Sequence, residues 1–178
     1  MSAFNRSFTP WAGAVVACLF IRPGAAEVLS SGQNGFELRE SVRVSAAPQK
    51  AYAALLQPAR WWSSSHTFSG NAANLTLEAR AGGCWCETLP DGGSVEHMHV
   101  VYVAPGHTLR LRGALGPFQG LGVEGAMTWS LKGNADTTEI SVTYTVGGYS
   151  KDGFEGAAKG VDQVLGEQLQ LLKKLIEG

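Results

Sequence analysis

Two cysteines and two histidines lie on either side of a predicted turn and have the residue types of a metal or redox site. Cys84 and Cys86 precede the turn signal Asp91-Gly92, and His97 and His99 follow it. Asp-Gly is a favoured two-residue hairpin turn. With the turn centred there, Cys86 faces His97 and Cys84 faces His99, so all four side chains share one face of the hairpin. Thiolate and imidazole suit zinc or copper, which makes these four residues candidate metal ligands.

Three interpretations of these residues remain open. Residues i and i+2 of a strand are about 6.8 Å apart, whereas ligands must approach a zinc ion to about 2.0–2.3 Å, so a flat hairpin would bring only two or three of the four together. A Cys84–Cys86 disulfide fits an oxidising compartment but needs a bulge or twist, because about 6.8 Å is the upper limit for its Cα separation. In the third interpretation the cysteines are small half-buried residues beside ordinary surface histidines. No cofactor other than such a metal is predicted.

The opposite face of the same hairpin carries larger side chains. Trp85, Glu87, Met98 and Tyr102 alternate with the cysteines and histidines and are expected to form a cavity wall. A carboxylate on such a wall needs a hydrogen-bond partner or a raised pKa. Glu87 is therefore the first candidate for acid–base catalysis and His97 the second. The alternative role for Glu87 is a structural hydrogen bond to a neighbouring strand or to an arginine.

The elements that position this hairpin are strands with one apolar face. Apolar and polar residues alternate with a period of two, and valine, threonine and aromatic residues are frequent. This pattern is typical of antiparallel strands that pack on one side and face water on the other. The segments outside the hairpin that show it are 36–44, 75–80, 109–112, 127–131 and 139–146. Together with the hairpin they predict a sheet of six to seven strands.

Helices are expected in two places. After the first strand, Pro48 and Pro58 begin two short helices, the second carrying Trp61-Trp62. At the end of the chain, apolar residues recur every three or four positions over 154–176, which predicts one long helix. The fold class is therefore α+β, a curved antiparallel sheet around a long C-terminal helix.

This combination predicts a cavity. Six strands span roughly 25–30 Å, while one helix covers only about 10–12 Å. The sheet must curl around the helix, and the space between them can hold an apolar or amphipathic small molecule. The residues predicted to contact that ligand are Trp61, Trp62, Trp85, Glu87, Met98, Tyr102, Phe118, Trp129, Val161 and Leu165.

The N-terminal segment is predicted to be an export signal. Arg6 precedes an apolar run over 11–21, and Gly24-Ala25-Ala26 supplies small residues for cleavage. The expected domains are a signal peptide (1–26), a spacer (27–35) and a ligand-binding domain (36–178). Cleavage would place the protein in the periplasm or outside the cell; in the alternative, Cys18 is lipid-modified and anchors it.

The composition is that of one domain with a substantial core. The chain has 178 residues, of which 44% are hydrophobic and 16% charged. Removal of 1–26 takes away two arginines and no acid, so the net charge moves from −1 to −3. Nothing basic remains to indicate nucleic acid as a partner, and no transmembrane segment is expected in the mature protein.

The order of elements resembles the START-like (SRPBCC) superfamily, the helix-grip fold of the major birch-pollen allergen. The resemblance covers residues 36–177 and rests on the Pro48 helix that leads to Trp61-Trp62, on Gly82-Gly83 before Trp85, on Pro105 between two strands, and on the terminal helix. Within the superfamily the chain looks like the branch of polyketide cyclases and the homology domain of activators of the heat-shock ATPase. It departs from other members at the two cysteines and two histidines of the hairpin.

The resemblance implies a helix-grip fold but leaves the function open, because the superfamily includes carriers, cyclases and hydrolases. We expect an exported small-molecule-binding protein. The alternatives are a cyclase- or hydrolase-type enzyme that uses Glu87 or His97, and a metal-binding protein that uses the hairpin. A role in activating a chaperone ATPase is disfavoured by export. No base–nucleophile pair is recognisable in the sequence, so a binding role is favoured over an enzyme.

Overall fold

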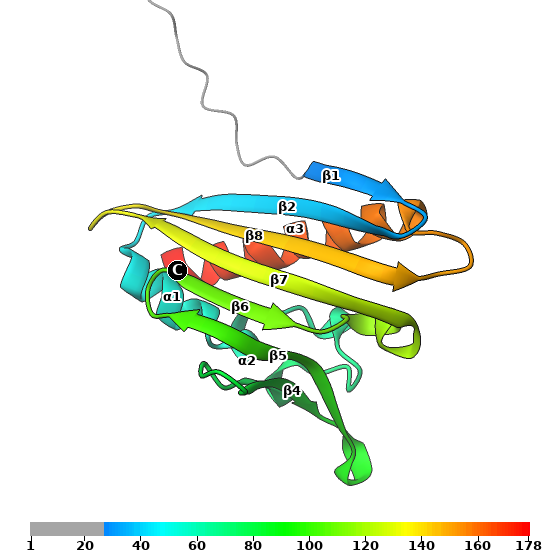
Figure 1. The fold of residues 1–178 in the computed structure, drawn as a ribbon. Helices are drawn as coiled ribbons and strands as arrows, with labels where there is room; N and C mark the ends of the chain where they lie inside the picture. Colours follow the sequence, from blue (N-terminus) through cyan, green and yellow to red (C-terminus); the bar gives the residue numbers. More distant parts are fainter. Residues whose placement is uncertain (1–26) are drawn as a thin grey trace, which may run out of the picture.

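The computed structural model describes residues 27–178, which form one large sheet and one long helix across it (Figure 1). The predicted signal peptide at 1–26 and the alternative lipid attachment at Cys18 lie outside the described residues. All strand pairs are antiparallel, and the strands are ordered β1-β2-β8-β7-β6-β5-β4-β3. The strands are β1 (Glu27–Gly32), β2 (Gly35–Val44), β3 (Leu75–Leu77), β4 (Cys84–Thr88), β5 (Ser94–Ala104), β6 (Thr108–Arg112), β7 (Gly122–Gly133) and β8 (Thr138–Tyr149). This is the predicted α+β helix-grip architecture.

The sheet has eight strands rather than the expected six to seven. The additional strand is β1, which lies in the segment 27–35 that the sequence indicated as a spacer. This segment is polar and lacks a clear alternation, yet it pairs with β2 through backbone hydrogen bonds at the edge of the sheet. Edge pairing depends on backbone groups, so its stabilisation leaves little trace in the side-chain pattern.

The helices occur where the sequence predicts them. Short helices α1 (Pro48–Leu55) and α2 (Pro58–Trp61) follow β2, and each begins with a proline, whose missing N–H is not needed in a first turn. The long helix α3 (Glu155–Glu177) ends the chain. Within residues 27–178, no helix is both long enough and apolar enough to span a bilayer.

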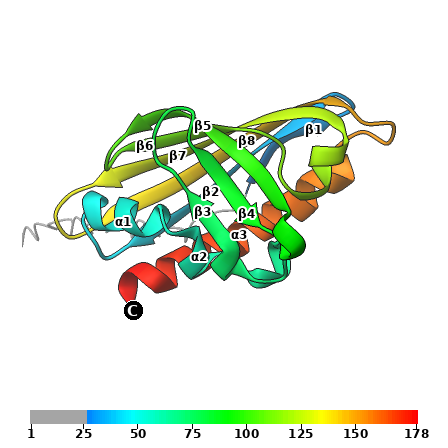
Figure 2. The same cartoon turned by 90° about the horizontal axis from the view of Figure 1, so that it is seen from below.

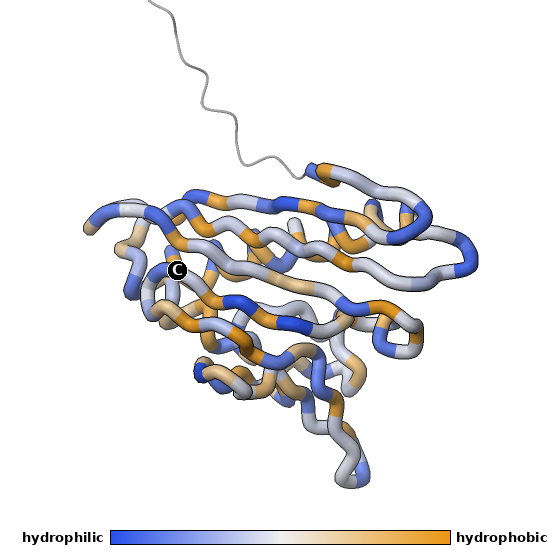
Figure 3. The backbone as a smooth tube through the Cα atoms, in the orientation of Figure 1, coloured by the Kyte–Doolittle hydropathy of each residue, from blue (hydrophilic) through white to orange (hydrophobic). Residues whose placement is uncertain are grey.

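The core lies between the apolar face of the sheet and the apolar stripe of α3. Hydropathy alternates along the central strands, as Figure 3 shows. In β8, Ile140, Val142 and Tyr144 are fully buried, and Leu165 and Leu172 of α3 pack into the same cluster. Burying such side chains supplies most of the stabilisation of a domain of this size.

Helix α3 covers only part of the sheet. It packs mainly against β2 and β1 and is flanked by α1 and α2. The other end of the sheet bends round, and β3 and β4 pass in front of α3 in Figure 2. The curvature is helped by two register shifts along β5, because an extra residue in one strand bends it and increases its twist. The uncovered part of the sheet forms one wall of the site described next.

Candidate functional site

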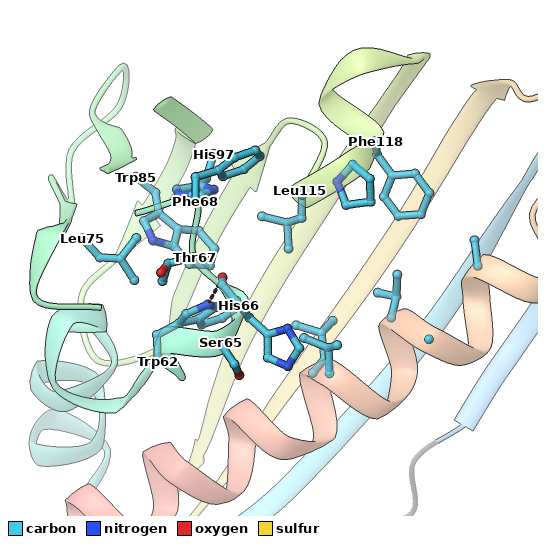
Figure 4. A pocket seen from close by; sticks show the side chains of 17 residues that line it. Trp62, Ser65, His66, Thr67, Phe68, Leu75, Trp85, His97, Leu115 and Phe118 are labelled. Atoms are coloured by element: carbon cyan, nitrogen blue, oxygen red, sulfur yellow. Dashed lines mark hydrogen bonds between the residues drawn. The ribbon is translucent and has the colours of Figure 1, made fainter. Parts of the chain in front are cut away.

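A cavity of about 630 Å³ lies between α3 and the curled half of the sheet (Figure 4). Its walls come from α3, the loop 62–68 after α2, the β4–β5 hairpin, and the loop 115–118 between β6 and β7. The lining is mostly apolar and aromatic. A space of this size and character is typical of a site for a small organic molecule. The geometric argument from the sequence, that one helix is too narrow for the sheet, is confirmed.

Five of the ten side chains predicted to contact a ligand do line this cavity. They are Trp62, Trp85, Phe118, Val161 and Leu165. The two indoles stack edge to face with ring centroids 4.9 Å apart, which fixes both rings in the wall.

Three other predicted contacts lie in the packed core instead. Trp61, Met98 and Trp129 are almost completely buried and do not line the cavity. Trp61 and Trp129 contact each other at 5.9 Å between centroids. All three are large residues on the inner side of their helix or strand, but neighbouring side chains cover them. In this structure they belong to the packed core and not to the cavity wall.

Tyr102 lies on the wrong face of the sheet for the predicted contact. It is 49% exposed, and the Arg110 guanidinium sits over its ring at 5.5 Å. The reason is a register shift in β5: Val100 pairs with Leu111 and Tyr102 with Arg110, so Val101 is an extra residue. One extra residue reverses which face the following side chains occupy.

Most of the lining residues that were not predicted lie in irregular loops without a periodic pattern. They are Ser65, His66, Thr67, Phe68, Leu115, Gly116 and Pro117; Leu75 of β3 and Ala157, Gly160 and Val164 of α3 join them. Phe68 is 53% exposed although it lines the cavity, which places it at the mouth. A helical wheel of α3 would have indicated Val164, which shares a face with Val161.

The polar centre of the wall is a pair formed by Glu87 and His97. Oε2 of Glu87 is 2.9 Å from Nε2 of His97, and both side chains are buried. The backbone N–H of Phe68 donates to the same carboxylate oxygen at 3.1 Å, and that of Ser69 donates to Oε1. Glu87 thus connects β4, β5 and the loop at the cavity mouth. It does not itself line the cavity, contrary to prediction, whereas His97 does.

The environment fixes the protonation of the pair. Burial alone would raise the pKa of Glu87, but hydrogen bonds from Ser69, Phe68 and His97 outweigh it and bring that pKa below its usual value. Burial lowers the pKa of His97, and Glu87 only partly offsets this. At neutral pH the pair is therefore carboxylate and neutral imidazole. A carboxylate can only accept, so Nε2–H of His97 donates to it, and Nδ1 keeps a free lone pair.

That lone pair is the chemically distinctive feature of the cavity. No described residue donates a hydrogen bond to Nδ1 of His97. The ring lies between Phe68 and Trp85, with centroids 5.9 and 5.8 Å away. An acceptor held in an aromatic wall can bind a hydroxyl or N–H of a ligand, or remove a proton from one.

A β-bulge brings His97 to the cavity. Trp85 pairs with Met98, but Cys86 pairs with Glu96, so His97 is an extra residue in β5. Gly113 accommodates the bulge with φ of +143°; a Cβ there would lie 2.8 Å from the carbonyl oxygen of His97. The predicted pairing of Cys84 with His99 is confirmed, and that of Cys86 with His97 is wrong.

Of the three interpretations of the cysteines, the structure shows the disulfide. Cys84 and Cys86 form a disulfide, with Cα atoms 5.4 Å apart. The four candidate metal ligands are not brought together, because the two cysteines are bonded to each other, His97 is buried against Glu87, and His99 is half-exposed beside Glu96. Among residues 27–178, no group of three or more histidine, cysteine or acidic side chains is arranged to hold a metal ion.

Comparison with known proteins assigns the fold to a family. The family model described as polyketide cyclase/dehydrase and lipid transport matches residues 35–177. Among solved structures, protein MLL2253 from Mesorhizobium loti has a TM-score of 0.57 at 19% identity, over 79% of this chain and 96% of its own. CalU16 from Micromonospora echinospora has a TM-score of 0.58 at 14% identity, over 88% and 86%.

At these identities the solved structures support the fold alone. A search of curated proteins finds no match. Neither the family model nor the two structures names an activator of a heat-shock ATPase, so that part of the sequence resemblance stays a prediction. The family match extends over most of the chain and includes every wall of the cavity. The chain belongs to the polyketide cyclase/dehydrase and lipid transport family of the START-like (SRPBCC) superfamily.

Proposed function

We propose that this protein binds a small amphipathic molecule that has an apolar body and one hydrogen-bond donor. The observation that carries the proposal is the apolar cavity of about 630 Å³ whose wall contains His97 with an unoccupied acceptor atom. The apolar body would pack against Trp62, Trp85 and Phe118. The donor would bind Nδ1 of His97, which Glu87 orients from behind. The family description, which includes lipid transport, supports a ligand of this kind.

A matched pair of probes tests the donor requirement. 2-Naphthol and 2-methylnaphthalene have nearly the same shape, but only the first donates a hydrogen bond. We expect the wild type to bind 2-naphthol about tenfold more tightly, equivalent to about 1.4 kcal/mol, because the other probe desolvates Nδ1 without pairing it. His97→Phe should remove this preference and retain the binding of 2-methylnaphthalene. Equilibrium dialysis at pH 7 gives both dissociation constants.

The location of binding is tested with two glycines of α3. Both Gly156 and Gly160 have open space where a Cβ would be, but only Gly160 lines the cavity. Gly160→Trp should lower the affinity for both probes at least about tenfold, whereas Gly156→Trp, with the same change in the same helix, should leave both unchanged. Equal binding of the two probes by the wild type, or equal effects of the two tryptophans, would refute the proposal.

The Glu87–His97 pair also supports a second function, an enzyme of the cyclase or hydrolase type. A neutral imidazole oriented by a buried carboxylate has the arrangement of a general base. In this case His97 would take a proton from the bound molecule through Nδ1. Incubating the molecule recovered from the host with wild type and with His97→Phe separates the two functions. Chemical conversion by the wild type alone favours the enzyme; unchanged mass with both favours the binding protein.

We propose further that the protein is exported and works outside the cytoplasm. The apolar run at 11–21 and the small residues at 24–26 support this, and a Cys84–Cys86 disulfide is suited to an oxidising compartment. The intact mass of protein purified from its own host tests it. A chain that begins at Glu27 supports cleavage, one that begins at a lipid-modified Cys18 supports the anchored form, and an uncleaved chain contradicts both.

A further inference from the structure

The disulfide lies directly behind the wall of the cavity. Cys84 and Cys86 are half-buried on the outer face of β4, and Trp85 between them projects to the inner face, where it lines the cavity. Glu87 follows immediately. The bond therefore spans the backbone that carries one wall residue and the residue that orients His97.

The disulfide contracts this backbone. Its Cα atoms are 5.4 Å apart, whereas residues i and i+2 of an extended strand are about 6.8 Å apart. The contraction coincides with the register shift, which falls between Trp85 and Cys86. The residue of β5 that this shift leaves without a partner is His97, so the bulge lies directly opposite the disulfide.

The register shift opposite the disulfide determines where the side chain of His97 lies. Without the shift, the simple alternation of the hairpin would pair His97 with Cys86 and place its side chain on the outer face. With the shift, the ring is buried beside Glu87 and lines the cavity. Gly113 and the hydrogen bond between His97 and Glu87 also support the bulged form, so loss of the disulfide should loosen the arrangement without unfolding the domain.

We propose that the Cys84–Cys86 disulfide is a positioning element of the ligand site, which holds Trp85, Glu87 and His97 in register so that the cavity selects ligands with a hydrogen-bond donor. This inference rests on the proposed function. It adds that selectivity, more than affinity for the apolar body, depends on the oxidation state of the two cysteines. Reduction by a dithiol yields two thiols here and one disulfide in the reductant, so the exchange balances.

The experiment compares oxidised wild type, wild type reduced with excess dithiothreitol, and Cys84→Ser/Cys86→Ser. Two thiols gained per chain on reduction, counted by mass after alkylation, verify the change. We expect the preference for 2-naphthol over 2-methylnaphthalene to fall about fivefold in the reduced protein and in the double variant. The affinity for 2-methylnaphthalene should change less than about twofold, and dithiothreitol should have no effect on the double variant.

A second measurement does not depend on the probes. The side-chain nitrogen signals of His97 in ¹H–¹⁵N spectra, assigned with His97→Phe, should shift on reduction, while those of the exposed His107 should not. An unchanged probe preference together with unchanged His97 signals in verified reduced protein overturns the inference. If oxidised protein shows no preference for 2-naphthol, the proposed function fails instead, and the His97 signals alone still decide whether the disulfide positions the ring.

Discussion

Replacing Glu87 with alanine is expected to lower the free energy of unfolding by about 3–5 kcal/mol, because the buried carboxylate accepts three hydrogen bonds and its removal leaves a cavity. Its side chain is fully buried, and it accepts hydrogen bonds from the backbone of Phe68 and Ser69 and from Nε2 of His97. Alanine leaves these donors unpaired and opens a cavity beside Trp85. Denaturation in urea at pH 7 measures the loss.

Two further variants control this result. Glu87→Gln keeps the shape and one carbonyl acceptor and should recover part of the loss. Glu78→Ala removes a carboxylate that is 56% exposed and paired only with Arg80 on the surface, so it should cost less than about 0.5 kcal/mol. If Glu87→Ala costs no more than Glu78→Ala, the carboxylate does not hold the mouth loop to the sheet.

The hydrogen bonds to Glu87 also determine how the stability of the folded protein depends on pH. The pKa of Glu87 is lower in the folded protein than its usual 4.5, because the hydrogen bonds outweigh the effect of burial. Its stabilisation is therefore complete above about pH 4.5 and is lost as the pH falls through the folded value. The difference in stability between wild type and Glu87→Gln should accordingly shrink below pH 4.5.

The architecture could be predicted because it follows from periodicity and width. Strands β2, β7 and β8 pair without a register shift, and they form with the expected faces. The apolar stripe of α3 is equally regular. From these two patterns the existence of a cavity follows by geometry alone. The need of Glu87 for hydrogen-bond partners follows separately, from its place on the inner face of the hairpin.

The detailed site could not be predicted because its decisive features are local insertions. A bulge adds one residue to a strand without changing the residue types around it, and both bulges in β5 moved side chains to the other face. As a result, the side chain of His97 lines the cavity, and that of Tyr102 lies on the outer face of the sheet. The mouth loop that carries Phe68 is positioned by bonds from its backbone to Glu87, and backbone donors have no signature in the sequence.

A second buried carboxylate was not singled out by the sequence, although it interrupts the apolar face of β2. Glu40 is only 4% exposed and faces α3, where Asp162 lies against it. Val142 of β8 is its partner in the sheet. No lysine, arginine or histidine among the described residues pairs with either acid. Gly166 leaves room for the group, since a Cβ there would lie 3.4 Å from Oε1 of Glu40.

The surroundings of this pair favour a protonated Glu40. Oε1 of Glu40 and Oδ1 of Asp162 are buried, and neither has a donor in the structure. A proton on one carboxyl would satisfy both. Burial, reinforced by the nearby Asp162, raises the pKa of Glu40 from 4.5 to about 7. The folded protein therefore favours a neutral Glu40.

Replacing Glu40 with glutamine is expected to stabilise the protein at pH 8 by about 2–3 kcal/mol, because the amide remains neutral and can donate to Asp162. Since the folded pKa is raised, the favourable contribution of Glu40 is complete below pH 4.5 and is lost as the pH rises to about 7. Wild type and variant should thus be similar near pH 4.5 and diverge above it. Urea denaturation at pH 4.5, 6, 7 and 8 follows the divergence.

The matched control is Glu37→Gln, which makes the same change on the other face of β2, where the side chain reaches water. Its stability should follow that of the wild type at every pH.

Because Asp162 lies between Val161 and the cavity-lining Val164 of α3, relief of the buried charge should also reduce local opening of the helix at pH 8. Slower hydrogen exchange of α3 amides in Glu40→Gln would show this. Parallel stability curves for Glu40→Gln and wild type would mean that the carboxyl pair does not carry the charge penalty.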